Sequence, residues 1–132
     1  SAASDVYKRQ VLAVAAAHLG ASAVVGVDRK PEAVEATRRN ADANGFGGQI
    51  RAVGHDLATI DGGFDVVVAN VARDGIVALA DQLVAKTRTG GWLGVSGLSP
   101  DQCDLVAGFL APMREAGHRA VDGWAMQVFT KP

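Results

Sequence analysis

The sequence has 132 residues, the length of one domain, and carries 13 lysine and arginine residues against 14 aspartate and glutamate residues. The formal net charge of -1 excludes the strongly basic surface that binds nucleic acid or anionic membranes, so we predict neither partner. The single cysteine, Cys103, excludes an internal disulfide and a cysteine metal site, and it predicts a reducing, cytoplasmic location with Cys103 as a small apolar residue.

The first predicted elements are a helix and a strand. Residues 11–19 are nearly all apolar and precede Gly20, which is typical of a buried helix, and residues 23–27 are typical of a strand buried on both faces. With Lys8 before them, the same letters also resemble a secretory signal. We favour the helix and strand because they explain the same letters, and the apolar run ends short of the roughly 20 residues that a membrane span needs.

A second helix and two more strands follow. Residues 30–44 predict a helix because Pro31 suits a first helical turn and Asn44-Gly45 suits a helix end. Residues 50–53 predict a short strand. Residues 64–70, with the sequence FDVVVAN, predict a longer buried strand. This strand ends on a polar residue, as the earlier run VVGVD does, so polar residues recur at strand ends.

The second half of the chain continues the alternation of helices and strands. Residues 74–87 predict a helix, residues 90–98 a strand opened by a Gly90-Gly91 turn, and residues 100–116 a helix closed by Gly117. Strict alternation predicts an α/β fold with a parallel sheet that is covered on both faces and joined by right-handed crossovers.

The end of the chain departs from this alternation. Residues 118–121 and 124–130 are both strand-like, and only Asp122-Gly123 separates them. A parallel crossover needs a dozen or more residues, so this tight turn predicts an antiparallel hairpin. The sheet is therefore predicted to be Rossmann-like, mostly parallel, with an antiparallel last strand.

Four stretches resemble one family in order along the chain. They are VLAVAAAHLGASAVVGVDRKPEAVEATRRNADANG, FDVVVANVARDGIVALA, TGGWLGVSGLSPDQ and GWAMQVFTKP. Together they are similar to the catalytic domain of the ribosomal protein L11 methyltransferase family, over residues 11–132. The resemblance implies a class I methyltransferase fold, S-adenosylmethionine as the cofactor, and amines of ribosomal protein L11 as the substrate.

The resemblance also implies site residues. Asp28, at the end of VVGVD, is expected to accept hydrogen bonds from the ribose hydroxyls of the cofactor. Asn70 is expected to bind beside the transferred methyl group and the incoming amine, as both a cofactor-binding and a catalytic residue. Asp56 is expected near the adenine amino group. The structural alternatives are a strand-to-helix cap for Asp28 and a turn residue for Asn70. No metal site is predicted.

Several other residues are assigned structural roles. We expect buried or surface packing for the histidines, core or sheet-face positions for the tryptophans, and a solvated face for three arginines. These residues are His18 and His118, Trp92 and Trp124, and Arg38, Arg39 and Arg51.

The chain departs from the family upstream of Val11. The family has a glycine-rich turn before its first helix, whereas SDVYKRQ contains no glycine. We therefore interpret residues 1–10 as a foreign or disordered segment, and residues 11–132 as a partial catalytic domain that lacks its first strand. We expect the loss of this strand to expose the edges of its two neighbours, and we expect weak cofactor binding.

Two alternatives remain open at this point. A nicotinamide-dependent oxidoreductase domain would use an acid at position 28 in the same way, but it would carry a GxGxxG turn, which is absent, and would not end in a hairpin. An inactive remnant of the methyltransferase fold would keep the sheet without a working cofactor site.

Overall fold

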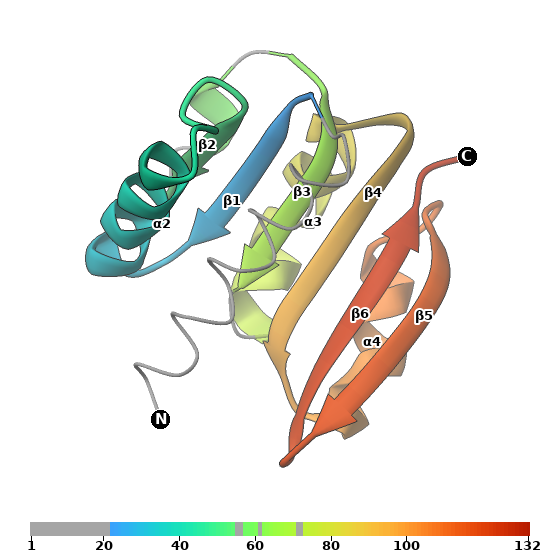
Figure 1. Cartoon of the computed structure of the whole chain (residues 1–132). Coiled ribbons are helices and arrows are strands. Elements are labelled where there is room, and N and C mark those ends of the chain that lie inside the picture. The colour runs from blue at the N-terminus through green and yellow to red at the C-terminus, as the bar shows by residue number, and fades with distance from the viewer. Residues whose placement is uncertain (1–21, 55–56, 61, 71–72) are drawn as a thin grey trace.

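The computed structural model describes residues 22–54, 57–60, 62–70 and 73–132 (Figure 1). Within these residues, six strands form one sheet in the order β2-β1-β3-β4-β6-β5. The strands are β1 (Val24–Asp28), β2 (Ile50–Val53), β3 (Phe64–Asn70), β4 (Thr87–Leu98), β5 (Arg114–Val121) and β6 (Trp124–Thr130). The helices are α2 (Pro31–Ala43), α3 (Arg73–Lys86) and α4 (Cys103–Phe109), with short 3-10 turns η1 (Leu57–Thr59) and η2 (Pro100–Gln102).

The strand directions confirm the predicted fold class. The pairs β1 with β2, β1 with β3, and β3 with β4 are parallel, whereas β6 runs antiparallel to both β4 and β5. The hairpin turn has positive φ angles of 52° at Asp122 and 79° at Gly123, which suits a tight turn between twisted antiparallel strands.

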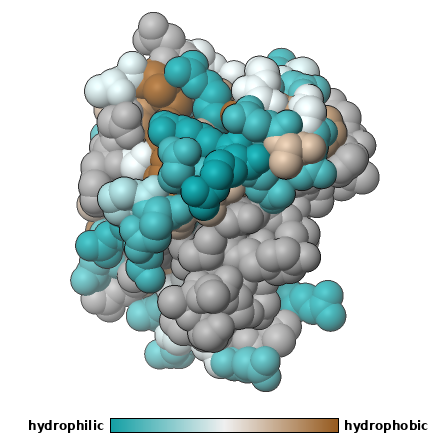
Figure 2. Space-filling view, turned by 60° about the vertical axis from the view of Figure 1, so that its left-hand side comes forward, coloured by the Kyte–Doolittle hydropathy of each residue, from teal (hydrophilic) through white to brown (hydrophobic). Residues whose placement is uncertain are grey.

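The sheet separates two apolar layers. Helix α2 packs on β1 and β2 over a small cluster of Val24, Ala41 and Ile50. Helices α3 and α4 lie on the opposite side of the sheet (Figure 1). The larger core lies under them and includes Val25, Val67, Leu83, Leu93, Val95, Val106 and Phe129, all 0% exposed. The outer face of α2 is hydrophilic (Figure 2), and Arg38 and Arg39 are exposed there, as predicted.

The prediction that the loss of a first strand exposes the edges of its two neighbouring strands is wrong. Instead, β1 pairs directly with β3, from Val24 opposite Val66 to Asp28 opposite Asn70. Each of the two strands presents a row of backbone N–H and C=O groups, and pairing satisfies these groups at the centre of the sheet.

The predicted helix over residues 100–116 is also wrong. Helix α4 ends at Phe109, and β5 begins at Arg114. Pro112 explains the early end, because proline lacks the N–H that a helix needs and disfavours helical geometry at the preceding residue. Gly117 does not close a helix but lies within β5, where the pairing register with β6 shifts between Glu115 and Gly117.

Strand β4 begins three residues before the predicted Gly90-Gly91 turn. Gly90 has a positive φ of 82°, and a Cβ atom on Gly91 would lie 2.8 Å from the carbonyl oxygens of both Arg88 and Asp65. The two glycines are therefore accommodated inside the strand, at an irregularity where the backbone passes too close to its neighbours for any side chain.

The remaining structural predictions are partly confirmed. Cys103 is buried in the core, where burial and then the nearby carboxylates Glu115 and Asp104 raise the pKa of its thiol. Trp92 lies on a sheet face but is 46% exposed, because the adjacent Leu93 occupies the core position. His118 is exposed, and its Nδ1 lies 2.8 Å from Glu115 Oε1.

His18 and the predicted helix over residues 11–19 lie outside the described residues, as does the side chain of Trp124. Within the described part of the chain, no helix is long and apolar enough to cross a membrane.

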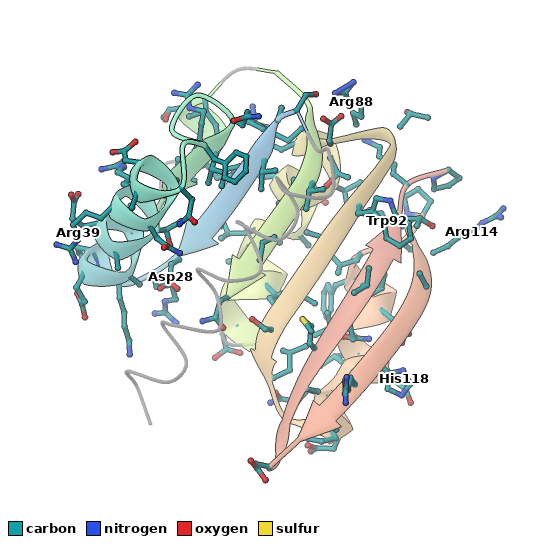
Figure 3. The ribbon with its side chains drawn as sticks, viewed as in Figure 1. Asp28, Arg39, Arg88, Trp92, Arg114 and His118 are labelled. Carbon is teal, nitrogen blue, oxygen red and sulfur yellow. The ribbon has the colours of Figure 1, made fainter. Side chains whose placement is uncertain are left out.

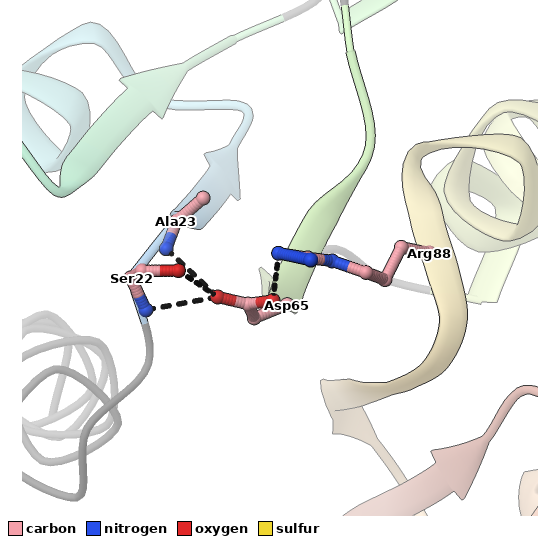
Figure 4. Close-up of polar contacts among 4 residues, drawn as sticks. All are labelled: Ser22, Ala23, Asp65 and Arg88. Carbon is pink, nitrogen blue, oxygen red and sulfur yellow. Dashed lines mark hydrogen bonds and ion pairs between the residues drawn. The ribbon is translucent and has the colours of Figure 1, made fainter.

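Asp65 joins three strands at the amino edge of the sheet (Figure 4). Its Oδ2 accepts hydrogen bonds from Ser22 N (2.8 Å), Ser22 Oγ (2.6 Å) and Ala23 N (3.1 Å), and its Oδ1 pairs with Arg88 at the start of β4. The Ser22 hydroxyl, the two backbone N–H groups and Arg88 hold the pKa of Asp65 below its usual value against the opposing effect of burial. The carboxylate thus fixes the start of β1 against β3.

Asp65→Asn is expected to lower the free energy of unfolding at pH 7 by about 1–2 kcal/mol, because the amide accepts weaker hydrogen bonds and loses the Arg88 ion pair. A carboxylate with a lowered folded-state pKa stabilises the fold above its unfolded-state pKa, near 4, and loses this effect as the pH falls through the folded value. Urea unfolding at pH 7 and at pH 3 measures both effects. Asp81→Asn, at an exposed position on α3, is the control. An equal gap between wild type and Asp65→Asn at both pH values would contradict this account.

Candidate active site

Asp28 and Asn70 are register partners at the carboxyl ends of two adjacent parallel strands. Both side chains are largely buried, with 8% of Asp28 and 9% of Asn70 exposed. Figure 3 shows Asp28 at the carboxyl end of β1, beside α2, and Arg88 at the opposite edge of the sheet. The prediction that Asp28 and Asn70 share one edge is therefore confirmed.

The two polar side chains line the same hollow between the sheet and α2. Its wall consists of Gly26, Val27, Asp28, Val34, Thr37, Ala52, Val68 and Asn70, around a space of about 310 Å³ that is open to solvent. A mostly apolar surface with a few converging polar groups is the usual character of a small-molecule site.

Asp28 also shapes the local backbone. Its Oδ1 accepts a hydrogen bond from Lys30 N at 3.0 Å, so the carboxylate turns the chain from β1 into α2. The structural alternative for Asp28, a cap between the strand and the helix, is therefore present. A carboxylate has about four acceptor positions, so this turn is compatible with hydrogen bonds to a ligand.

Gly26 and Thr37 belong to the hollow, although the sequence alone did not indicate them. Gly26 lies two residues before Asp28 in β1 and so faces the same side of the sheet. A Cβ atom on Gly26 would lie 3.8 Å from Thr37 Cγ2, so the missing side chain deepens the space under α2. The signal in the sequence was the glycine at this alternate position of an otherwise valine-rich strand.

Ser96 is a second residue that sequence reasoning missed. Its Oγ donates a hydrogen bond to Asn70 Oδ1 at 3.0 Å, and the two residues are register partners in β4 and β3. The signal was again a polar residue at the end of an apolar strand, in WLGVSG.

The third predicted site residue, Asp56, lies outside the described residues, as does the adjacent His55. The described chain just before them comes close to Asp28, because a Cβ atom on Gly54 would lie 3.5 Å from the Asp28 carbonyl oxygen. Among the residues that the structure does describe, no group of three or more His, Cys, Asp or Glu residues is placed to hold a metal ion.

Comparison with known proteins identifies the family to which this chain is similar. Residues 9–131 match the protein family described as ribosomal protein L11 methyltransferase (PrmA). The chain belongs to the ribosomal protein L11 methyltransferase family. It is 38% identical over 122 residues to the ribosomal protein L11 methyltransferase of Citrifermentans bemidjiense, and 40% identical over 126 residues to that of Dechloromonas aromatica. Each match covers 92% of this chain and 40% of the relative, so the chain spans less than half the length of these relatives.

Solved structures show the same fold. A ribosomal protein L11 methylase from Lactobacillus delbrueckii superposes with a TM-score of 0.72 at 28% identity, over 92% of this chain and 64% of that one. TrmN from Thermus thermophilus, at 22% identity, superposes with a TM-score of 0.62 over 92% of this chain and 40% of that one, and shows the fold alone. The family match excludes the alternative that this chain is a nicotinamide-dependent oxidoreductase domain.

Proposed function

We propose that this chain is the cofactor-binding part of an S-adenosylmethionine-dependent methyltransferase that transfers methyl groups to amines of ribosomal protein L11. The observation that supports this proposal most strongly is the pairing of Asp28 and Asn70 at one edge of the sheet, on the wall of one hollow. The family match supplies the class of substrate.

The residues of the hollow suit a nucleoside. Asp28 offers a carboxylate to the ribose diol, with charge-assisted hydrogen bonds of about 1.5–3 kcal/mol each. Val34, Ala52 and Val68 offer apolar surface to the flat base. In the proposed complex Asp56 contacts the adenine amino group. When bound, S-adenosylmethionine supplies an electrophilic methyl group on a sulfonium sulfur.

Asn70 has the chemistry that this reaction needs from the protein. An in-line displacement on carbon depends mainly on the alignment of the nucleophile and on the exclusion of water. The amide oxygen of Asn70 accepts a hydrogen bond from a neutral amine without a charge that would favour the protonated, unreactive form. In the proposed mechanism Asn70 therefore aligns the amine of the substrate with the methyl group.

The role of Asp28 is tested by titration of S-adenosylmethionine into the chain to millimolar concentration, followed by two-dimensional NMR. We expect shifts in the backbone signals of Gly26, Asp28 and Asn70. Asp28→Asn is expected to weaken binding about tenfold or more, because the amide forms neutral hydrogen bonds to the ribose. It keeps an oxygen for the Lys30 N–H and so preserves the turn into α2.

Asp81→Asn removes a carboxylate from an exposed position on α3, on the opposite face of the sheet, and is the matched control. NMR signal shifts confined to residues outside the hollow would contradict the assigned site. Equal affinity of wild type and Asp28→Asn for S-adenosylmethionine would contradict it as well. Methyl transfer itself is measured as a mass increase of ribosomal protein L11. Absence of both cofactor binding and methyl transfer would instead favour an inactive remnant of the fold.

A further inference from the structure

The plane of the Asn70 side-chain amide is held by its neighbour on β4. The Ser96 hydroxyl donates to Asn70 Oδ1 at 3.0 Å, across the register pair that joins the ends of the two strands. An amide side chain is planar, so a hydrogen bond to its oxygen also sets the direction of its NH2 group. Rotation of the Asn70 amide by half a turn would replace this bond with one donated by the Asn70 NH2 group to Ser96 Oγ, so a hydrogen bond to the hydroxyl holds the plane of the amide in either case.

The strand that carries Ser96 is locally irregular in a way that suits this contact. The pairing of β4 with β6 shifts between Ser96 and Leu98, and Gly97, with a φ of +94°, is the extra residue. Val95 and Leu98 are both 0% exposed. In a regular strand Leu98 would share a face with Ser96, so the bulge at Gly97 allows both apolar residues to enter the core while Ser96 keeps its contact with Asn70.

We infer that Ser96 is a positioning residue for methyl transfer, acting through Asn70. This inference rests on the proposed function. An amide oxygen accepts up to two hydrogen bonds, so a bond from Ser96 is compatible with a second one from the substrate amine. The Ser96 hydroxyl fixes the amide plane before the amine arrives, and the amine therefore meets an acceptor that is already aligned.

The test compares Ser96→Ala, which removes the hydroxyl, with Ser96→Thr, which restores it. The first measurement is the pair of Asn70 side-chain NH2 signals in the NMR spectrum, assigned by their loss in Asn70→Ala. We expect this pair to shift in Ser96→Ala and to return toward the wild-type position in Ser96→Thr. Thr89→Val removes a hydroxyl from an exposed position on the same strand and is the control.

The second measurement is the rate of methyl transfer to ribosomal protein L11. Ser96→Ala is expected to lower kcat about 3- to 10-fold, with the KM for S-adenosylmethionine nearly unchanged, because one neutral hydrogen bond that aligns the nucleophile is lost. Ser96→Thr is expected to recover most of this loss. A residue that served only stability would change neither the Asn70 signals nor kcat selectively.

The outcomes separate the inference from the function on which it rests. Unchanged Asn70 signals in Ser96→Ala would overturn the positioning role. Unchanged kcat in Ser96→Ala would overturn it as well. Absence of methyl transfer, both in the wild-type chain and in a chain with a glycine-rich turn in place of residues 7–10, would count against the proposed function, and the NMR signals would then still decide whether Ser96 holds the Asn70 amide.

Discussion

Replacement of Tyr7, Lys8, Arg9 and Gln10 with a glycine-rich turn is expected to strengthen binding of S-adenosylmethionine by about two to four orders of magnitude. These residues occupy the place where the family resemblance implies a glycine-rich turn, and they lie outside the described residues. Glycine allows backbone N–H groups to approach a ligand closely, whereas a residue with a bulky side chain does not allow so close an approach. Each recovered hydrogen bond contributes about 0.5–1.5 kcal/mol, and several together give the expected change.

Isothermal titration calorimetry on the two chains measures this difference. A third chain with alanines at the same four positions is the control, because it removes the bulky side chains without the backbone freedom of glycine. We expect the alanine chain to bind nearly as weakly as the chain with its own residues. Tight binding by the unaltered chain would show that residues 7–10 do not impair the site.

Asn70→Ala is expected to lower kcat for methyl transfer about a hundredfold, while the Kd for S-adenosylmethionine changes much less. The substitution removes the acceptor that aligns the amine, and misplacement of a reacting group by about 1 Å has an effect of this size. Steady-state kinetics with ribosomal protein L11 and calorimetry with the cofactor measure the two effects separately. An equal loss in kcat and in affinity would show that Asn70 acts in cofactor binding rather than in alignment. If the unaltered chain binds S-adenosylmethionine too weakly for kinetics, Asn70→Ala is compared with its parent in the chain that has the glycine-rich turn.

Asn70→Asp gives a sharper form of this test. It has nearly the same shape as asparagine, but its carboxylate favours the protonated form of a nearby amine and so raises the pKa of that amine. The neutral, reactive form then appears at higher pH, so the rising limb of the pH–rate profile is expected to move upward. Asn70→Ala is not expected to move this limb upward. An unchanged profile in Asn70→Asp would place the amine away from residue 70.

Local patterns in the sequence were enough to predict most elements of this fold. The strand over residues 64–70 was predicted to the residue, because a continuous apolar run has a clear start and a polar end. The antiparallel last hairpin was also predicted, because two residues at Asp122-Gly123 cannot span a parallel crossover, although β5 begins at Arg114, four residues before the predicted start. The shared edge of Asp28 and Asn70 followed from strand direction alone.

Two local signals in the sequence are ambiguous. Apolar residues continue past Phe109, and this pattern predicts a longer helix. Pro112 instead ends the helical region, and β5 begins at Arg114. The Gly90-Gly91 pair predicts a turn, but the two glycines lie at an irregularity within β4. Glycine has the same backbone freedom in both settings, so composition cannot distinguish them.

The order of helices and strands, the antiparallel end of the sheet and the edge at which the polar strand ends lie can all be predicted from local sequence. These properties depend on residues that are neighbours along the chain. Three features became visible only in the folded chain: β1 pairs with β3, the hollow extends over Gly26 to α2, and Ser96 binds Asn70. Strand pairing joins residues about 40 positions apart, here Asp28 and Asn70, and the bulge at Gly97 depends on a partner strand that follows later in the chain. Such contacts follow from how backbone hydrogen bonds are satisfied across the whole sheet, which no local pattern of residues records.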